Sequence, residues 1–310
     1  MATGTIVTAM TRVIIDCDPG HDDAVALMLA HRHAQVLGIS TVSGNAPLAA
    51  TTANALMVTA LLDVDTPVHA GAARPLAGEP RHAQVVHGQS GLDGVERVEH
   101  RRTVAGDDAV EFLLDAPDPD VWIIALGPLT NLALAIDRDP SWVQRIAGIS
   151  IMGGSATVGN TTRVAEFNIF ADPEAAARVF QAGAELTMCG LNLTHQLRTT
   201  DAIVSRLRKA ANPRAKFAAG LFDYLHTRME DLIGTREAAL HDPCAVLAVT
   251  HPQLIETEPR AVDIELEGTL TRGMTVVDQR STRRQDPANA RVAYRIDAGR
   301  AMDLVLECMD

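Results

Sequence analysis

Short apolar runs that alternate with helix-like stretches restrict the fold more than any other feature of the sequence. Each run ends in small or polar residues before the next helical stretch begins. The clearest runs lie at residues 13–15, 36–42, 121–126, 149–152 and 186–189. Such runs are typical of parallel strands buried on both faces, and their alternation with helices indicates βαβ units. We therefore expect an α/β fold with a mostly parallel, Rossmann-like central sheet flanked by helices, and an active site at the carboxyl ends of the strands.

The rest of the chain predicts a single domain over residues 1–310, because no internal repeat, low-complexity tract or Gly/Ser-rich linker divides it. Residues 1–11 precede the first strand, and we expect them to form a flexible N-terminal extension. Residues 74–102 are rich in Gly, His and charge without periodicity, which predicts a long functional loop. Further helices are expected at residues 47–62, 129–136, 213–232 and from Gly299, and further strands at residues 261–266, 274–278 and 292–296.

Charge and composition narrow the class of partner. The net charge of −12 argues against a surface for nucleic acid or an anionic membrane, so the substrate is expected to be neutral or cationic. The four cysteines lack CxxC spacing, which indicates neither a zinc knuckle nor a disulfide framework. No apolar run reaches transmembrane length, and residues 1–11 do not read as a signal peptide. We expect a soluble cytoplasmic protein.

Four aspartates cluster directly after the first strand. Asp16, Asp18, Asp22 and Asp23 fall within eight residues, interrupted by a Pro-Gly turn and followed by an Ala-rich helical stretch. They are expected at the carboxyl end of a strand, where open α/β sheets bind their ligands. So many carboxylates repel one another unless a cation or an unusual protonation state relieves them. The cluster is therefore first of all a candidate metal site.

Three interpretations of these acids remain open on the residues alone. One or two of them could cap the following helix, but capping does not explain four. A strand followed by Asp-x-Asp also resembles the haloacid-dehalogenase-like phosphatases, although Gly20 stands where that pattern has Thr or Val and the chain is poor in lysine. The third interpretation is a hard-cation site in which carboxylates and a backbone carbonyl hold Ca²⁺.

Other expected strand ends carry polar residues as well. Asn45 follows the second strand, where it caps a helix or offers an amide to a hydroxyl group. Glu166 and Asn168 lie two positions apart, so an extended chain would point them in the same direction. Asp172 precedes Pro173 and predicts the start of another helix.

Two histidines become candidates for catalysis only when the neighbouring motifs are considered with them. His241 and Asp242 begin a helical stretch, where the helix dipole would keep the imidazole neutral or poised. His87 lies in the long loop and, taken alone, reads as a solvated side chain.

Together these segments resemble the inosine–uridine nucleoside hydrolases. Residues 16–24, Asp-Cys-Asp-Pro-Gly-His-Asp-Asp-Ala, are similar to the first signature of that family. Six later matches follow in the family's order: Ser43-Gly44-Asn45, His87-Gly88, residues 127–131, Met152-Gly153-Gly154, residues 166–173 and His241-Asp242-Pro243. The resemblance covers nearly the whole chain and leaves little support for the phosphatase interpretation.

The resemblance implies hydrolysis of the N-glycosidic bond of ribonucleosides to ribose and free base. It implies one Ca²⁺ held by the carboxylates of Asp18, Asp23 and Asp242 and by the backbone carbonyl of Leu126. Asp18 would be the general base toward water, and Asp16 would support its neighbours. The residues implied for ribose binding are Asp22, Asn45, Met152, Asn160, Glu166, Asn168 and Asp242. Relatives are commonly homodimers or homotetramers, and by analogy we expect the same here.

The base preference depends on fewer residues. By resemblance, His87 and His241 donate protons to the leaving base, and His241 marks the nonspecific and pyrimidine-preferring members. Trp122 and Trp142 fall in an expected core strand and an expected helix start, so neither suits a stacking site for purines. We expect a preference for pyrimidine nucleosides, uridine first. The alternatives are a broad inosine–uridine hydrolase and a calcium-dependent nucleoside-binding protein with weak or lost activity.

Two departures from the family pattern bear on that preference. Residues 224–240 should cover the base, yet residues 229–234 contain no aromatic side chain, and Tyr224 and His226 come earlier. Gln89 stands where many relatives have Glu after the His-Gly pair. Reduced activity or an altered base preference would follow from these differences.

Overall fold

Eight strands form one sheet through the centre of the molecule, in a computed structural model that describes residues 10–115, 118–281 and 286–309. Their order across the sheet is β3-β2-β1-β4-β5-β6-β12-β9. In that order they span Val68–Ala70, Gln35–Thr41, Arg12–Cys17, Val121–Ala125, Gly148–Met152, Leu186–Cys189, Ala290–Ile296 and Ile255–Arg260. All neighbouring pairs are parallel except β12 with β9, which is antiparallel. The expectation of a mostly parallel sheet is confirmed.

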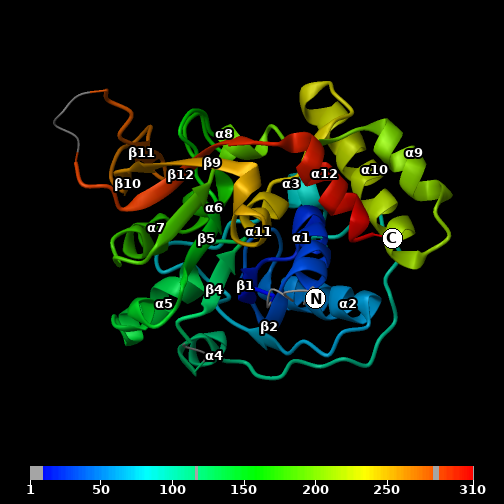
Figure 1. The fold of residues 1–310 in the computed structure, drawn as a ribbon, viewed down its shortest axis with the longest axis horizontal. Helices are drawn as coiled ribbons and strands as arrows, with labels where there is room; N and C mark the ends of the chain where they lie inside the picture. The colour runs from blue at the N-terminus through cyan, green and yellow to red at the C-terminus, as the bar shows by residue number, and fades with distance from the viewer. Residues whose placement is uncertain (1–9, 116–117, 282–285, 310) are drawn as a thin grey trace, which may run out of the picture.

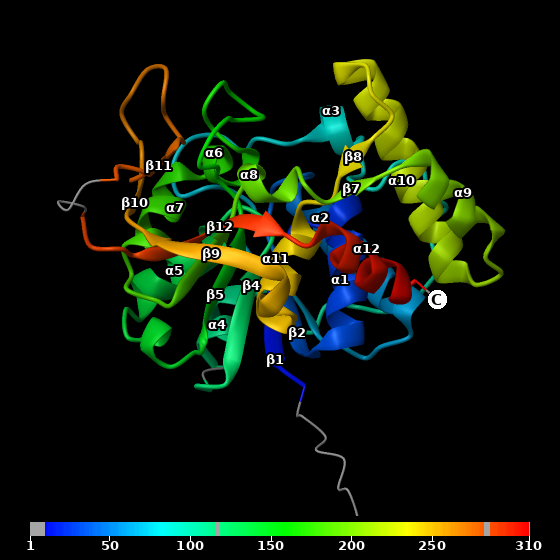
Figure 2. The same ribbon diagram turned by 45° about the horizontal axis from the view of Figure 1, so that its top comes forward.

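Helices cover both faces of this sheet (Figures 1 and 2). One face carries α4 (Ala109–Asp115), α5 (Thr130–Arg138) and α7 (Pro173–Phe180), and the other carries α1 (His21–His33), α2 (Leu48–Leu62) and α11 (Asp242–Thr250). The side chains of β1 alternate accordingly: Val13 and Ile15 belong to one buried cluster and Ile14 to the other. Two apolar cores therefore hold the sheet between helical layers.

The remaining elements complete the two layers and the loops. The remaining helices are α3 (Gln84–His87), α6 (Phe167–Ala171), α8 (Leu191–Thr194), α9 (Asp201–Lys209), α10 (Pro213–Ile233) and α12 (Ala298–Glu307), with short 3₁₀ turns at Trp142–Gln144 and Pro252–Leu254. Two small antiparallel sheets pair β10 (Val262–Ile264) with β11 (Thr275–Val277) and β7 (Arg198–Thr199) with β8 (Ala238–Ala239). No helix in the described ranges is both long enough and apolar enough to cross a membrane.

The outer part of the sheet differs from the sequence expectation. Residues 261–266 and 274–278 contain strands as expected, but these pair with each other outside the central sheet. One edge of the central sheet is instead β9, which the sequence did not predict. Its residues are mostly polar and include Pro259, which an edge strand tolerates because one side of it needs no ladder hydrogen bonds. The expected extension at residues 1–11 falls largely in residues 1–9, outside the described residues.

The strand order places the switch point of the doubly wound sheet beside β1. The chain winds from β1 to β2 and β3 on one side, then crosses to β4, β5 and β6 on the other. Where the winding direction of a doubly wound sheet reverses, the loops at the carboxyl ends of the neighbouring strands separate and leave room for a ligand. The loops after β1, β2 and β4 meet at this point.

Candidate functional site

Asp18 follows β1 and lies between two glycines. A Cβ atom on Gly44, after β2, would come within 1.9 Å of Asp18 Oδ2, and a Cβ on Gly127, after β4, within 2.6 Å of Oδ1. Any larger residue at either strand end would displace the carboxylate. Oδ2 accepts a 2.6 Å hydrogen bond from the backbone N–H of Asn45, whereas Oδ1 has no partner among the described residues. One buried carboxylate oxygen is thus left available for a ligand.

Three further carboxylates converge beside it. Asp22 and Asp23 come from the first turn of α1, and Asp242 is the first residue of α11. One oxygen of each can be chosen so that all three lie within 4.8 Å of one another, and all three side chains are buried. The packing of α1 against α11 brings together residues more than two hundred positions apart. Helix N-termini favour negative charge, which helps to hold the acids there.

These acids resist ionisation together. Burial, together with the charge of Asp22, raises the pKa of Asp23 to about 7. Burial and the neighbouring carboxylates likewise raise the pKa values of Asp18 and Asp242 well above the usual range. A cation at the centre of the group offsets both the loss of hydration on burial and the repulsion between the carboxylates. Hard oxygen donors, mutual repulsion and the unpartnered Asp18 oxygen therefore fit a divalent cation such as Ca²⁺.

The expected metal ligands lie close together, but only some of them belong to the three-carboxylate group. Asp23 and Asp242 belong to the three-carboxylate group, whose third member is Asp22, a residue expected to bind ribose. Asp18 adjoins the group, since its backbone N–H donates to Asp23 Oδ1 over 3.3 Å. The carbonyl oxygen of Leu126 accepts a 2.6 Å hydrogen bond from Asn168 Nδ2.

Glu166 and Asn168 do not lie in an extended segment, so that part of the sequence interpretation is wrong. Glu166 is the N-cap of α6, and its carboxylate accepts hydrogen bonds from the backbone N–H groups of Gly154, Asn168 and Ile169 at 2.8–3.2 Å. These bonds satisfy the free amides of the first turn and make the chain coil at Phe167. Burial raises the pKa of Glu166 to about 7.

Asn168 nevertheless reaches the strand ends. Its Nδ2 donates to the carbonyl oxygens of Leu126 and Met152, at 2.6 and 3.0 Å. The residue therefore ties α6 to the ends of β4 and β5. Asn160 is exposed, and its Oδ1 accepts from the backbone N–H of Phe167 at 3.0 Å, which places it beside the start of α6.

Asn45 and Asp16 connect the acids to their surroundings. Asn45 Nδ2 donates to Asp23 Oδ2 over 3.0 Å and to the carbonyl oxygen of Asp18 over 3.2 Å. Asp16 accepts from Ser40 Oγ at 2.5 Å and from Asn131 Nδ2 at 2.7 Å. Burial raises the pKa of Asp16 to about 6. Asp16 thus links β1 to β2 and α5 directly below the loop that carries Asp18.

Two buried histidines lie near the acids. His241 precedes α11, and its Nδ1 lies 2.7 Å from Thr194 Oγ1. His87 ends α3, and its Nδ1 lies 3.1 Å from Nδ1 of His21. Burial lowers the pKa of both rings, that of His87 to about 3 with a contribution from the charge of His241. The charge of His241 thus reaches His87.

Sequence reasoning missed His21 and Thr194, the partners of these histidines. His21 lies inside the first signature, but the sequence interpretation considered only the acids around it. Thr194 lies 47 positions before its partner His241. It follows Gly190 at the end of β6, so the recurring rule that polar strand ends approach the site could have identified it.

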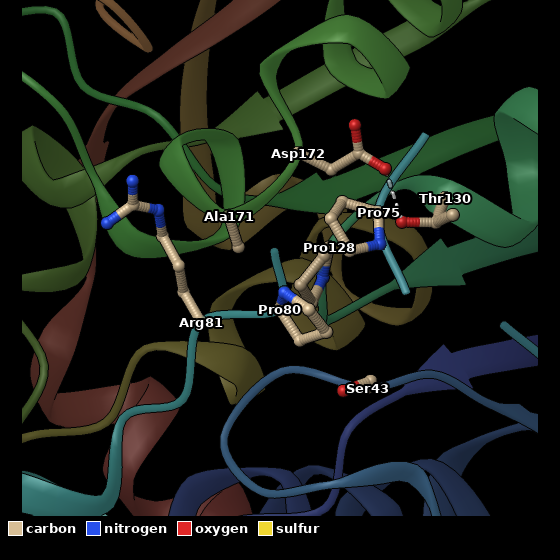
Figure 3. A pocket seen from close by; sticks show the side chains of 8 residues that line it. All are labelled: Ser43, Pro75, Pro80, Arg81, Pro128, Thr130, Ala171 and Asp172. Atoms are coloured by element: carbon tan, nitrogen blue, oxygen red, sulfur yellow. Dashed lines mark hydrogen bonds between the residues drawn. The ribbon is translucent and has the colours of Figure 1, made fainter. Parts of the chain in front are cut away.

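Hydrogen bonds hold the long loop of residues 74–102 beside the site. The backbone N–H of Leu76 in this loop donates to Asp172 Oδ2, and that of Ala72, just before the loop, donates to Asn131 Oδ1, both at 2.8 Å. Asp172 also accepts from Thr130 Oγ1 at 2.7 Å and caps α7 through the N–H of Ala175. Figure 3 shows a small pocket beneath this loop, lined by Ser43, Pro75, Pro80, Arg81, Pro128, Thr130, Ala171 and Asp172. Asp172 is therefore a structural cap that anchors the loop.

Neither tryptophan is placed to stack a base beside the acids at the strand ends. Trp122 lies near the amino end of β4, where its ring packs over Gly148. Trp142 is fully buried and donates from Nε1 to the carbonyl oxygen of Leu113. The expectations that Trp122 lies in a core strand and Trp142 at the start of a helical turn are confirmed.

Comparison with known proteins agrees with this geometry. The family model for the inosine-uridine preferring nucleoside hydrolases matches residues 13–303. The chain is 41% identical to the pyrimidine-specific ribonucleoside hydrolase RihA of Shewanella sp. (strain ANA-3), over 96% of this chain and 95% of the relative. It is 39% identical to an inosine-uridine preferring nucleoside hydrolase of Leishmania major, over 96% and 97% of the two chains.

A solved structure agrees as well. The purine-preferring ribonucleoside hydrolase from Gardnerella vaginalis superposes with a TM-score of 0.90 at 30% identity, covering 96% of this chain and 98% of that one. The buried acids at the switch point, the two histidines and these likenesses lead to one conclusion: the chain belongs to the inosine-uridine preferring nucleoside hydrolase family and is a nucleoside hydrolase.

Proposed function

We propose that this enzyme cleaves the N-glycosidic bond of ribonucleosides with water in a calcium-dependent reaction, and that it prefers pyrimidine nucleosides, uridine first. The observation that supports this most is the meeting of four buried acids, next to two buried histidines, at the carboxyl ends of the strands. Acids suit a ribose that becomes positively charged, and histidines suit a base that leaves with negative charge. By analogy with the family we also propose a cytoplasmic homodimer or homotetramer.

The metal proposal assigns the cation to Asp18, Asp23 and Asp242, with the backbone carbonyl of Leu126 as a further donor. Asp22 lies in the same three-carboxylate group and adds its charge to the field at the site. When bound, the cation lowers the pKa of the attacking water and orients it.

Asp18 is proposed as the general base. Its Oδ1 has no hydrogen-bond partner among the described residues, and its Oδ2 is held by Asn45. The carboxylate is therefore fixed in place with one oxygen ready to accept a proton from water.

The ribose is proposed to lie across the acids. Asp22, Asn45, Glu166 and Asn168 carry the acceptors and donors that hydroxyl groups need, and Asp242, Asn160 and Met152 are proposed to complete the ribose site. As the glycosidic bond breaks, positive charge builds on the ribose ring, as in other glycoside cleavages. Fixed carboxylates around that charge stabilise the transition state more than the neutral substrate.

His87 and His241 are proposed to protonate the leaving base. Each ring is anchored through Nδ1, His87 by His21 and His241 by Thr194. Anchoring at Nδ1 leaves Nε2 as the nitrogen that can reach a ligand. A nucleoside-binding protein without activity would not need two such groups, so this rival has little support.

The pyrimidine preference is supported by the relatives and by the tryptophans. The chain shares 41% identity with a pyrimidine-specific hydrolase and 30% with a purine-preferring one. Both tryptophans serve the core, which leaves no indole pair to enclose a purine. The second candidate is a broad inosine–uridine specificity, which the Leishmania major relative favours.

A nucleoside panel assayed for released reducing sugar tests the proposal. We expect turnover in the order uridine, cytidine, inosine, and at least a 100-fold lower kcat/KM for 2′-deoxyuridine, because buried polar groups are left unpaired when a hydroxyl is missing. Equal kcat/KM for uridine and inosine would establish the broad specificity instead. Comparable turnover of uridine and 2′-deoxyuridine would refute the ribose assignment.

A further inference from the structure

His21 lies inside the first family signature and contacts His87, which belongs to the His87-Gly88 match. It is the first residue of α1, directly before Asp22 and Asp23, and it is fully buried. Its Nε2 lies 2.9 Å from the carbonyl oxygen of Asp93, and its Nδ1 lies 3.1 Å from Nδ1 of His87. Its ring stacks on Tyr224 of α10, with ring centroids 4.9 Å apart and planes 7° apart.

The partners of His21 determine where its proton lies. A carbonyl oxygen only accepts hydrogen bonds, so the contact with Asp93 requires a hydrogen on Nε2 of His21. In a neutral imidazole the other nitrogen is then a bare acceptor. Nδ1 of His21 therefore accepts from His87, whose own Nδ1 carries the hydrogen.

A second contact at the same nitrogen is weaker. The backbone N–H of His21 lies 3.3 Å from His87 Nδ1, a bond that would need that nitrogen to be bare. The ring contact is shorter, at 3.1 Å, and the proton fixed on His21 Nε2 gives it a defined direction. The ring contact thus sets the tautomer of His87.

The surroundings of His21 are rigid. The carboxylate of Asp93 accepts from the N–H groups of Gln89 and Ser90 and from Ser90 Oγ, which closes the turn just after His87. Gly94 packs against Tyr224, since a Cβ there would come within 2.5 Å of the tyrosine ring. The turn closed by Asp93 and Tyr224 of helix α10 together hold the His21 ring in place.

We propose that His21 is a positioning residue for His87: it accepts the Nδ1 hydrogen of His87, fixes the plane of that ring, and leaves Nε2 to face the leaving base. This inference rests on the proposed function. In the free enzyme His87 is a neutral imidazole with a bare Nε2, because burial lowers its pKa to about 3, so Nε2 first takes up a proton from solvent. During cleavage the electron pair of the C–N bond goes to the base, and this Nε2 proton moves to the same base. His87 remains as a neutral imidazole whose Nδ1–H is still bonded to His21.

Two variants and two substrates test the proposal. His21→Leu removes the acceptor, whereas His21→Asn keeps an oxygen near the place of Nδ1. Uridine needs protonation of its base, whereas 4-nitrophenyl β-D-ribofuranoside releases a stable phenolate that needs none. The matched control is His31→Leu on the same helix, about 15 Å further along its axis. Thermal unfolding of each variant reports whether it folds.

The expected result is selective. For His21→Leu, kcat on uridine falls about 10- to 100-fold with KM within twofold, because general acid catalysis is worth 10²–10⁴ and only its alignment is lost. Its kcat/KM for the nitrophenyl riboside stays within twofold of wild type. His21→Asn recovers most of the lost uridine turnover, and His31→Leu behaves as wild type on both substrates.

Other patterns would overturn the inference. Equal loss on both substrates by a folded His21→Leu variant would assign His21 to the ribose side or to general stability, and no loss on either would remove its role. Two-bond ¹H–¹⁵N spectra give an independent readout, with Nδ1-protonated His87 expected in wild type and not in His21→Leu; an Nε2-protonated wild-type ring refutes the contact. A wild-type enzyme inactive on both substrates would instead refute the proposed function.

Discussion

Asp18 has the most constrained surroundings of any single residue in the site. Two glycines leave space for its carboxylate, one asparagine holds Oδ2, and Oδ1 remains without a partner among the described residues. Its importance could be predicted from the sequence, because it stands at a strand end among other acids. The space that Gly44 and Gly127 provide could not, since it depends on how three strand ends come together.

Asp18→Asn should remove the proposed general base without disturbing the fold. We expect kcat on uridine to fall about 10²- to 10⁴-fold, because an amide accepts no proton from water at neutral pH. Steady-state kinetics with circular dichroism checks this. Asp63→Asn is the matched control, since Asp63 is exposed and its left-handed backbone tolerates asparagine. Wild-type activity in Asp18→Asn would contradict the assignment.

At the scale of elements, the sequence failed where a side chain rather than a pattern determines the local structure. Residues 166–168 looked extended, but the carboxylate of Glu166 caps α6 and coils the chain. Residues 255–260 contain too few apolar side chains to predict a strand, yet β12 pairs with them at the edge of the sheet. The buried strands β1 to β6, except the short β3, were predictable because continuous apolar runs have few other uses in an α/β chain.

Asp172 shows how one cap joins several elements. Asp172→Ala removes the cap of α7 and the bonds to Thr130 and Leu76 together. We expect the free energy of unfolding to fall by about 2–4 kcal/mol, since a cap contributes up to about 2 and bonds to a carboxylate a similar amount.

Urea denaturation of both proteins measures this difference. The control is Glu174→Ala, two residues further along the same helix, which loses only the partly exposed ion pair with Arg272 and should cost no more than about 1 kcal/mol. Equal effects of the two substitutions would contradict the anchoring role of Asp172.

At the scale of the whole molecule, the site exists only because the strand order brings distant segments together. Asp22 and Asp23 stand near the start of the chain and Asp242 near its last quarter, and α1 and α11 deliver them to one place. The order of motifs in the sequence indicated the family, but composition and periodicity alone did not indicate which acids would meet. A polar strand end could have pointed to Thr194, but its contact with His241 and the contact of His21 with His87 emerge only from the fold.

Stability of the metal-free protein should depend on pH in a defined direction. Buried carboxyls such as Asp23 and Glu166 have folded pKa values of about 7, above those of the unfolded chain. Such groups bind more protons in the folded state, so their contribution to stability is lost as pH rises through about 7. The lowered pKa values of His21 and His87, both about 3, act oppositely but only below their unfolded value of 6.5.

We therefore expect the Tm of metal-free protein to fall between pH 6.5 and 8. Because a cation binds the ionised acids, the rise in Tm caused by Ca²⁺ should grow over the same interval. Differential scanning calorimetry at several pH values, with chelator or with Ca²⁺, measures both. A Ca²⁺ effect that shrinks as pH rises would contradict the account of the acid cluster.

The most direct test of the central claim is ribose release from uridine by protein stripped with a chelator, before and after addition of Ca²⁺. We predict that stripping lowers the rate at least 100-fold and that Ca²⁺ restores it, whereas Asp242→Ala stays inactive in both states. Full activity in the stripped protein, with metal analysis confirming that no cation remains, would contradict the proposed mechanism. Absence of ribose release in the presence of Ca²⁺ would contradict the proposed reaction itself.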